Sequence, residues 1–600
     1  MTIFRREGSV KGFRKMRILR TMASVVAILG ICGAAGAFEI STGNEDVKIR
    51  WDNTFRYTLA DRVEGQKDSI INNVNADDGD RNYNTGIISS RLDLLSEADF
   101  IYKDNYGFRV SGAAWYDPIN TDQNLDNTSV ATSNHLENGV PKVGWNDYNK
   151  RYYKGPSGEL LDAFIFAKFD IAGMPLNLKA GRHTIFWGEA VGLAGTVHGI
   201  SYAQSPLDNA KGLAMPGVEA KELFRPLNNI SFQIQPTNTL SIAGQYLLEW
   251  EPNRVPEAGT YLGFSDLMMS GAESMIAGFN PAIGYLRAHK GKNIEPNGMG
   301  DWGLSTRWSP EWLEGTLGIY YRNFSDRFPQ IHVRPGAVGA GVAANPALAA
   351  LFDPSLTNMT IGKIGDYHLA FAQDIDLFGI SFSRQILGVS VGADLSYRMD
   401  MPLASESVWI LPAALTARKS GSIAAIPGEG QTGGARGDTW HAVLNSVGII
   451  NKTPLFDAAS WAMEFVWSHV DHLTQGAAVY KGRAGYTGID KPSSHYIGGA
   501  VSFTPIWFQV LPSVDLSMPL TIGAGLVGDS AVLMGGNENC GTYSFGFSAD
   551  ILSKYRAELK YIGFYGDTQN DAGQNYTSGR GVLSMLSDRD MVVLTLKATF

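Results

Sequence analysis

Two short clusters in the sequence hold residue types that could support catalysis or metal binding. A Gly-x-Ser-x-Gly match at 388–392 would suit a nucleophilic serine, but it lies inside an alternating strand pattern and no helix follows it. A nucleophile elbow needs a strand-to-helix turn there, so we interpret the match as chance. His469, Asp471 and His472 have a metal-like spacing, but on a strand His472 points away from the other two. Neither cluster predicts an active site.

A third cluster, the acidic run from Asn73 to Asp80, resembles a calcium-binding loop only loosely. Its glycine, Gly79, stands one position late, and Asn84 occupies the place of the bidentate acid. We therefore predict an exposed polar loop here. The three clusters together lead us to expect no catalytic residue, no metal, no cofactor and no enzymatic function.

A group of charged residues suits ionic anchoring better than catalysis. Arg182 and Glu189 stand where a predicted strand gives way to the long connection 188–227, and a pair between them could tie this connection to the wall behind it. Removing Glu189 would leave Arg182 unpaired, and we would then expect a leaky or poorly assembled protein. Alternatively, these side chains contact a transported molecule or gate its passage. The other candidates for this network are His183, Trp187, Asp208, Lys221 and Glu222.

The end of the chain alternates with the two-residue period of a β-strand. Its apolar face comprises Val592, Leu594, Leu596, Ala598 and Phe600, and the opposite face comprises Val593, Thr595, Lys597 and Thr599. One face for lipid, one face for a lumen and a terminal aromatic are typical of an outer-membrane barrel, in which we interpret Phe600 as the assembly signal. An edge strand of a soluble β-sandwich would show the same alternation, so the other end of the chain has to decide.

The start of the chain predicts a cleaved secretory signal at residues 1–37. The first twenty residues carry seven basic groups and one acid, and the apolar run from Met22 to Ala35 that follows is short for a bilayer span. Small residues at the end of this run place cleavage before Phe38. We expect the mature chain, residues 38–600, to form a single domain in the outer membrane of a Gram-negative bacterium.

Composition and charge narrow the class further. Loss of the signal's seven basic groups and one acidic group changes the formal charge of the chain from −9 to −15, which disfavours nucleic acid as a partner. No other stretch offers about 20 consecutive apolar residues, which excludes a helical membrane protein. The 11% of aromatic residues and the 68 glycines suit a barrel, where aromatics gird the membrane interfaces and glycines serve turns and close packing.

Turn-forming residues at regular intervals divide the mature chain into predicted strands. Eight tight joints, of which Lys103–Gly107 is the clearest, alternate with nine long connections. This pattern predicts an all-β fold, a transmembrane antiparallel β-barrel of about 18 strands with long external loops. Counts of 16 and 14 remain open because strand boundaries taken from one sequence are loose. Since lipid offers no hydrogen-bond partner, the sheet must close on itself.

Two long connections, 188–227 and 252–299, are too apolar to be ordinary surface loops. The apolar side chains of the second include Leu267, Met268, Met269, Met275 and Phe279. The connections could pack against one another as an external cap. They could instead fold into the barrel mouth as a plug and line a pocket for a hydrophobic compound, for which flexible methionines are suited.

Several short motifs resemble those of one family along essentially the whole mature chain. They are Phe38-Glu39-Ile40, Trp51-Asp52-Asn53-Thr54, Gly181-Arg182, Trp187-Gly188-Glu189, Tyr202-Ala203-Gln204-Ser205-Pro206-Leu207-Asp208, Glu219-Ala220-Lys221-Glu222-Leu223-Phe224, Glu249-Trp250-Glu251-Pro252, and Arg398 followed by Met401-Pro402-Leu403. The chain is in this respect similar to the proteobacterial family catalogued as domain of unknown function number 1302. The resemblance implies an outer-membrane barrel, often encoded beside a periplasmic lipoprotein-carrier-like protein and an inner-membrane exporter of the resistance-nodulation-division type.

Three functional classes follow from these observations. The first is a plugged or gated channel for hydrophobic or lipophilic compounds that works with the carrier and the exporter, and the apolar loops favour it. The second is a general diffusion porin, which the size of the barrel and its charged inner face favour. The third is a structural or docking barrel that transports nothing. In each case we expect a single barrel whose partners are membrane lipid, lipopolysaccharide and the barrel assembly machinery.

Overall fold

The computed structural model of the chain describes residues 38–127, 132, 135–215, 220–338, 345–571 and 576–600. The predicted signal segment, residues 1–37, lies outside the described residues. Among the described helices, none is long and apolar enough to cross a membrane.

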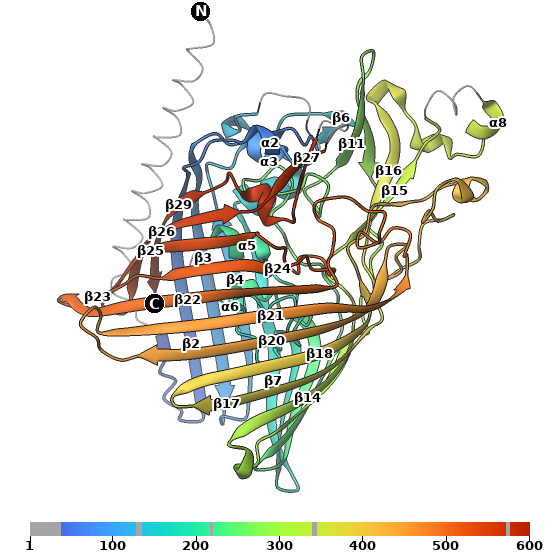
Figure 1. Cartoon of the computed structure of the whole chain (residues 1–600). Helices are drawn as coiled ribbons and strands as arrows, with labels where there is room; N and C mark the ends of the chain where they lie inside the picture. The colour runs from blue at the N-terminus through green and yellow to red at the C-terminus, as the bar shows by residue number, and fades with distance from the viewer. Residues whose placement is uncertain (1–37, 128–131, 133–134, 216–219, 339–344, 572–575) are drawn as a thin grey trace, which may run out of the picture.

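The described strands form one closed antiparallel barrel of eighteen strands, which confirms the predicted fold (Figure 1). In order around the wall they are β2 (Val47–Arg62), β3 (Gly86–Tyr102), β4 (Tyr106–Tyr116), β7 (Ser157–Ile171), β8 (Met174–His183), β9 (Leu227–Thr237), β10 (Leu240–Leu247), β13 (Trp302–Trp308), β14 (Gly315–Phe324), β17 (Ile375–Ile386), β18 (Val389–Pro402), β20 (Arg436–Ile450), β21 (Ala458–Gln475), β22 (His495–Leu511), β23 and β24 (Val514–Ser517 and Leu520–Val527), β25 (Gly541–Ile551), β26 (Tyr555–Tyr565) and β29 (Met591–Thr599). β23 and β24 are two parts of one strand interrupted at Pro519, and β1 (Phe38–Ile40) only extends the pairing of β2. The barrel closes where β29 pairs with both β26 and β2.

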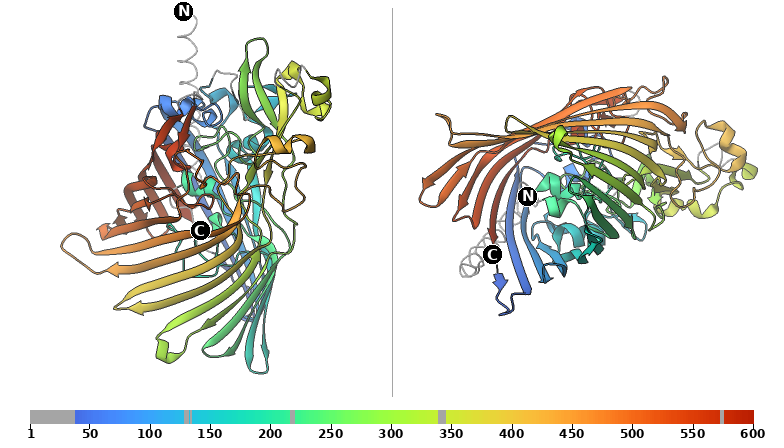
Figure 2. Two further views of the ribbon diagram at one scale, coloured as in Figure 1. Left: turned by 45° about the vertical axis from the view of Figure 1, so that its right-hand side comes forward. Right: turned by 90° about the horizontal axis from the view of Figure 1, so that it is seen from below.

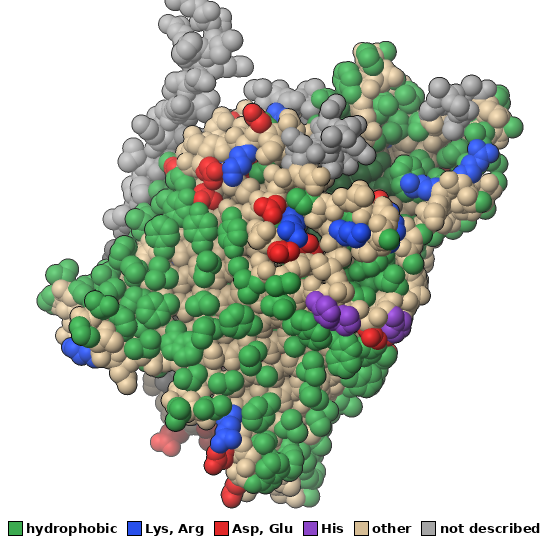
Figure 3. All heavy atoms as spheres, viewed as in Figure 1, with side chains coloured by type: hydrophobic (Ala, Val, Ile, Leu, Met, Phe, Trp, Pro, Cys, Tyr) green, Lys and Arg blue, Asp and Glu red, His purple; other side chains and the backbone are tan. Residues whose placement is uncertain are grey.

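The wall follows the alternation in the sequence. In β2 the side chains of Arg56 and Thr58 are buried inside the barrel. On the face of the wall seen in Figure 3, the outer surface is a broad belt of hydrophobic side chains with few charges. Large exposed apolar residues of the wall include Ile165, Ile319, Phe378, Leu444, Ile522, Phe545 and Leu559. This surface therefore suits lipid rather than water.

The two ends of the barrel differ in the length of their connections. At one end, the short-turn end, the eight joints between consecutive strands contain at most seven residues each. At the other, the long-loop end, all nine connections are longer. The predicted alternation of short and long connections is confirmed, and it is the arrangement of a bacterial barrel with long external loops.

The long connections carry elements of their own. β11 (Ser274–Asn280) and β12 (Gly284–Lys290) form a hairpin that joins β16 (Lys363–Ala370), β15 (Gln330–Pro335) and β19 (Val408–Trp409) in a five-stranded sheet at the barrel mouth (Figure 1). Two small hairpins pair β5 (Leu136–Glu137) with β6 (Val140–Pro141) and β27 (Thr568–Asp571) with β28 (Tyr576–Gly579). The short helices are α2 (Asp68–Ile71), α3 (Asp78–Arg81), α4 (Asp147–Asn149), α5 (Asn209–Ala214), α6 (Ala220–Leu223) and α8 (Pro346–Ala349).

Helices α5 and α6 lie inside the ring of strands rather than above it. They appear in teal within the ring in the view from below in Figure 2. Both belong to the connection between β8 and β9. The main cluster of buried apolar side chains joins residues of the wall to residues of this and other long connections. The core of the protein is therefore the filled interior of the barrel.

The last residue of the chain packs at the seam where the barrel closes. Phe600 and Asn53 exchange two backbone hydrogen bonds of 2.9 Å, and the Phe600 ring meets the Phe55 ring edge-on at 6.1 Å. We predict that Phe600→Ala lowers the free energy of unfolding by about 3 kcal/mol, because it removes a buried aromatic ring from the seam. A urea titration of the refolded chain measures the change.

Leu455→Ala is the matched control, because Leu455 is 78% exposed in a joint at the short-turn end. Its free energy of unfolding should change by no more than about 0.5 kcal/mol. Equal losses in the two variants would contradict the role of Phe600 in closure.

Candidate functional site

One long connection runs through the lumen. Residues 184–226, which we call the plug segment, leave the wall at the end of β8 and return to it at the start of β9. Trp187, Ile200 and Tyr202 of this segment belong to the buried interior. Apart from α5 and α6, the described part of the plug segment contains no helix or strand. Turns and the two short helices satisfy some of its peptide groups, and the others need hydrogen-bond partners outside the segment.

Glu464, on the inner face of β21, supplies three of these partners. Its carboxylate accepts hydrogen bonds from the backbone N–H groups of Val191 at 2.7 Å, Ala194 at 2.6 Å and Gly195 at 2.6 Å. The Glu464 side chain has no exposed surface. Successive N–H groups that converge in this way form an anion-binding turn, and here the barrel wall provides the anion.

Two arginines hold the middle of the plug segment by its carbonyl groups. Arg322 on β14 donates to the carbonyl oxygens of Ile200 at 2.8 Å and Tyr202 at 2.6 Å. Arg398 on β18 donates to the carbonyl oxygen of Gly199 at 3.0 Å, and its guanidinium lies 4.6 Å from the centre of the Tyr202 ring. Both arginines are buried. The two arginines therefore donate the hydrogen bonds that water would donate to these carbonyl groups in an open lumen.

The second half of the plug segment is fixed by ion pairs. The pairs are Arg56 with Glu222, Lys221 with Glu97, and Lys211 with Glu159 at 3.1 Å. The wall residues of these pairs belong to β2, β3 and β7, whereas the first half contacts β14, β18 and β21. The plug segment therefore bridges the lumen between distant parts of the wall.

The predicted pair between Arg182 and Glu189 is wrong. Arg182 lies 2.8 Å from a carboxylate oxygen of Glu249, and Glu189 lies 2.9 Å from Arg307 on β13. The chain turns into the lumen between the two predicted partners and carries Glu189 to β18, where Asp394 accepts its N–H at 2.8 Å. Both residues do anchor connections to the wall, but each uses a partner that is distant in sequence.

The structure also gives the other residues predicted for this network specific contacts. A ring nitrogen of His183 lies 2.7 Å from the Ser231 hydroxyl, the backbone N–H of Trp187 donates to the Gln204 side chain at 2.9 Å, and Asp208 lies 3.2 Å from Arg254. His183 and Trp187 lie where the plug segment enters the lumen. Asp208, Lys221 and Glu222 lie together in its charged second half.

The apolar residues predicted in the second long connection separate into two groups. Met269 is buried, and Met268 and Met275 pack against the same interior. The carbonyl group of Leu267 accepts a hydrogen bond from a buried tyrosine. Phe279 is 63% exposed on the β11–β12 hairpin, so its predicted place in a loop pocket is wrong. The connection pairs with itself at that point and projects outside the barrel.

The prediction of an exposed polar loop in the acidic run is also wrong. Asp77, Asp78 and Asp80 have no exposed surface. The connection 248–301, between β10 and β13, covers the run closely. A Cβ added at Gly79 would lie 2.4 Å from the carbonyl oxygen of Thr260 in that connection. Packing of one long connection on another, which the local sequence does not reveal, accounts for this burial.

A cavity of about 660 Å³ lies between the plug segment, the overlying connections and the wall at β22, β24 and β25. The wall contributes the small residues Ala500, Gly523 and Thr542, which leave room inside the barrel. The facing side chains are mainly apolar and include Val197, Leu213, Phe264, Met268, Val532, Leu533 and Met585. The cavity is thus an apolar compartment inside a barrel whose other inner surfaces carry many charges.

A second space of about 580 Å³ lies near the short-turn end and is polar. Its lining includes Lys179 of β8, Ser231 and Gln233 of β9, and Ser305 and Arg307 of β13. Phe186 lines both this space and the apolar cavity, and its ring meets the Phe224 ring edge-on at 5.5 Å. This aromatic pair lies at the boundary between the two spaces.

The wall residues that hold the plug segment are absent from the sequence-based candidates. Glu464, Arg322 and Arg398 each stand at an inward position of a strand, and each follows an apolar or aromatic residue. A charge at an inward position of such a strand is the signal that could identify them, since an unpaired charge there would be costly.

The model of one protein family matches residues 18–600 of the sequence, and its description is a protein of unknown function, DUF1302. The chain belongs to the DUF1302 family. The resemblance predicted from the short motifs is thereby confirmed. No curated protein matches this DUF1302 chain.

Solved bacterial structures match the DUF1302 chain over most of its length at low similarity. OmpF of Salmonella typhi in complex with daunomycin is 8% identical with a TM-score of 0.36, over 94% of this chain and 100% of that chain. OccAB1 of Acinetobacter baumannii is 8% identical with a TM-score of 0.39, over 95% and 99%. OpdK of Pseudomonas aeruginosa with vanillate is 8% identical with a TM-score of 0.35, over 92% and 98%. Similarities this low assign neither a substrate nor a mechanism to the DUF1302 chain.

The contacts of Glu464 predict that it fixes the plug segment more firmly than Glu189 does. Glu464→Ala leaves three N–H groups of the plug segment without their acceptor, and we expect the free energy of unfolding to fall by roughly 3 kcal/mol. Proteolysis within residues 184–226 should become faster in the same variant. Urea titration and timed digestion of the refolded chain measure the two effects.

Glu189→Ala is the matched control inside the same segment. Its carboxylate pairs with Arg307, whose side chain is 42% exposed to the polar space, so its removal should cost less than about 1 kcal/mol. A Glu464→Ala protein that digests no faster than the Glu189→Ala protein would contradict the assignment.

Proposed function

We propose that this protein is a plugged outer-membrane channel or transport component for hydrophobic or lipophilic compounds. The observation that carries the proposal is the apolar cavity between the plug segment and the small-residue wall of β22, β24 and β25. Ligand sites commonly have volumes of roughly 300–1,000 Å³ and a mainly apolar lining, and this cavity falls in that range. Methionine side chains in its lining adapt readily to molecules of different shape.

The plug segment supports this function over that of a general diffusion porin. An eighteen-stranded barrel is wide enough to hold water along its axis unless chain fills it. Here the filling segment is attached to the wall by buried carboxylates and arginines along both of its halves. Passage of a molecule then requires movement of the plug segment or of the side chains at its boundary, such as Phe186.

The same cavity favours transport over a purely structural or docking role. A barrel that serves only as a scaffold has no need for an apolar compartment, and small residues such as Ala500 and Gly523 leave this one open. In the proposed arrangement the apolar cavity holds the compound, and the polar space below Phe186 leads toward the short-turn end. A periplasmic lipoprotein-carrier-like protein and an exporter of the resistance-nodulation-division type would exchange the compound there.

The cavity predicts saturable binding of a small lipophilic probe. We expect the refolded chain to bind the fluorescent probe N-phenyl-1-naphthylamine, and Ala500→Phe to weaken this binding by about tenfold or more, because the added ring points into the cavity. A fluorescence titration at constant detergent concentration measures the dissociation constant.

Val501→Phe on the outer face of the same strand is the control. Its neighbour across the strand pair is Ile522, which is exposed on the lipid-facing surface, so the substitution should leave probe binding unchanged. Equal binding by the unmodified chain and both variants would place the probe in the detergent or on the outer surface, and the proposal would fail.

A further inference from the structure

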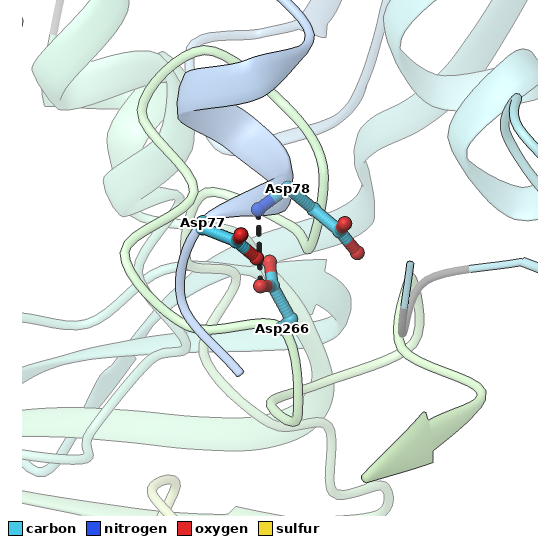
Figure 4. Close-up of side chains that lie close together, drawn as sticks. All are labelled: Asp77, Asp78 and Asp266. Carbon is cyan, nitrogen blue, oxygen red and sulfur yellow. Dashed lines mark hydrogen bonds between the residues drawn. The ribbon is translucent and has the colours of Figure 1, made fainter. Parts of the chain in front are cut away.

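Three buried carboxylates meet where two long connections of the barrel mouth pack together. Asp77 and Asp78 stand at the start of α3 in the connection 63–85, and Asp266 belongs to the connection 248–301 (Figure 4). One oxygen from each of the three carboxylates lies within 4.8 Å of the others, and none of the side chains has exposed surface. Ligand oxygens around a calcium ion, at 2.3–2.6 Å from it, lie at most about 5 Å apart. The spacing fits one bound cation.

Two of the carboxylates keep one oxygen each without a donor. Oδ2 of Asp266 accepts the backbone N–H of Asp78 at 3.1 Å, and Oδ2 of Asp77 accepts from Arg81. Oδ1 of Asp77 and Oδ1 of Asp266 are buried and have no hydrogen-bond partner among the described residues. Figure 4 shows the carboxylates of Asp77 and Asp266 facing each other. Buried acceptors of this kind are costly unless something positively charged lies between them.

The position of Asp266 is set by the backbone as well as by its carboxylate. Its N–H donates to the carbonyl oxygen of Asn75 at 2.8 Å, which places the two connections side by side at this point. The Asn75 side chain in turn contacts Ile276 through two hydrogen bonds of 2.8 Å. Hydrogen bonds between the two connections therefore hold the carboxylates close together, although their negative charges repel one another.

The electrostatics of the cluster favour added positive charge. Burial, followed by the nearby charge of Asp78, raises the pKa of Asp77 to about 7. Burial, followed by the charges of Asp78 and Asp77, raises the pKa of Asp266 well above its ordinary value. Arg81 offsets part of the charge on Asp77, and Arg589 acts on Asp266 from a greater distance. Carboxylates that share a buried site repel one another unless a proton or a cation separates them.

We propose that Asp77, Asp78 and Asp266 bind one calcium ion that fastens the connection 63–85 to the connection 248–301. A ligand set made only of oxygens selects a hard cation, and the flexible geometry of calcium tolerates three carboxylates completed by water. The bound ion stabilises the layer of long connections that covers the plug segment. The inference goes beyond the proposed transport function, and it reverses the expectation of a metal-free chain.

Calorimetric titration of the refolded, lipopolysaccharide-free mature chain with CaCl₂ tests the site directly. We expect one equivalent of Ca²⁺ to bind with a dissociation constant of about 1 mM or lower, as in other extracellular calcium sites. Asp266→Asn removes a carboxylate charge with little change in shape and should weaken binding by about tenfold or more. Heat-modifiable gel mobility shows that each sample is folded.

Asp353→Asn is the control, because Asp353 lies on another connection and pairs with Arg334 at 3.0 Å. It should bind Ca²⁺ as the unmodified chain does. If Asp266→Asn does not fold, Asp77→Asn takes its place, and the unmodified chain still has to bind one equivalent. Folded unmodified chain that shows no binding up to about 10 mM Ca²⁺, or equal binding by the variant and the control, would overturn the proposal.

Discussion

The structure depends on one constraint. A segment of the chain that lies inside the lumen must find hydrogen-bond partners for its peptide groups. The plug segment has little helix and no strand in its described part, so its own backbone satisfies only some of them. The wall supplies the partners through buried charges, with Glu464 accepting three N–H groups and Arg322 donating to two carbonyl groups. A buried charge is costly alone, but here hydrogen bonds to backbone groups stabilise Glu464 and Arg322. The charged side chains on the inner face of the barrel thus hold the plug segment in place.

The distribution of size and charge around the wall then determines the space that remains. Where the wall carries large charged side chains, as at β2, β3 and β7, it binds the plug segment by ion pairs. Where it carries small residues, as at Ala500 and Gly523, an apolar cavity remains open beside the plug segment. Phe186 and Phe224 lie between this cavity and the polar space near the short-turn end. One barrel therefore contains two compartments of opposite chemistry, which is the arrangement that the proposed transfer of a lipophilic compound would require.

Sequence patterns predicted the barrel well because its rules are local. The two-residue alternation at Val592–Phe600 and the spacing of tight joints follow from single strands and turns, and the strand count of eighteen is confirmed. Pairing inside the lumen follows no such local rule. Arg182 meets Glu249 rather than Glu189, and the buried Asp77 meets Asp266, because these contacts depend on how long connections cross in space. The exposed Phe279 fails for the same reason, since its connection forms a hairpin outside the barrel.

We propose that the plug segment closes the lumen, and single-channel conductance of the refolded mature chain in a planar bilayer tests this proposal most directly. Heat-modifiable gel mobility should first show that the barrel is folded. We expect silence or rare, brief openings, because the plug segment is attached to the wall along both halves. A large, stable and ohmic conductance would contradict it, because it would show an open aqueous pore of the general porin kind.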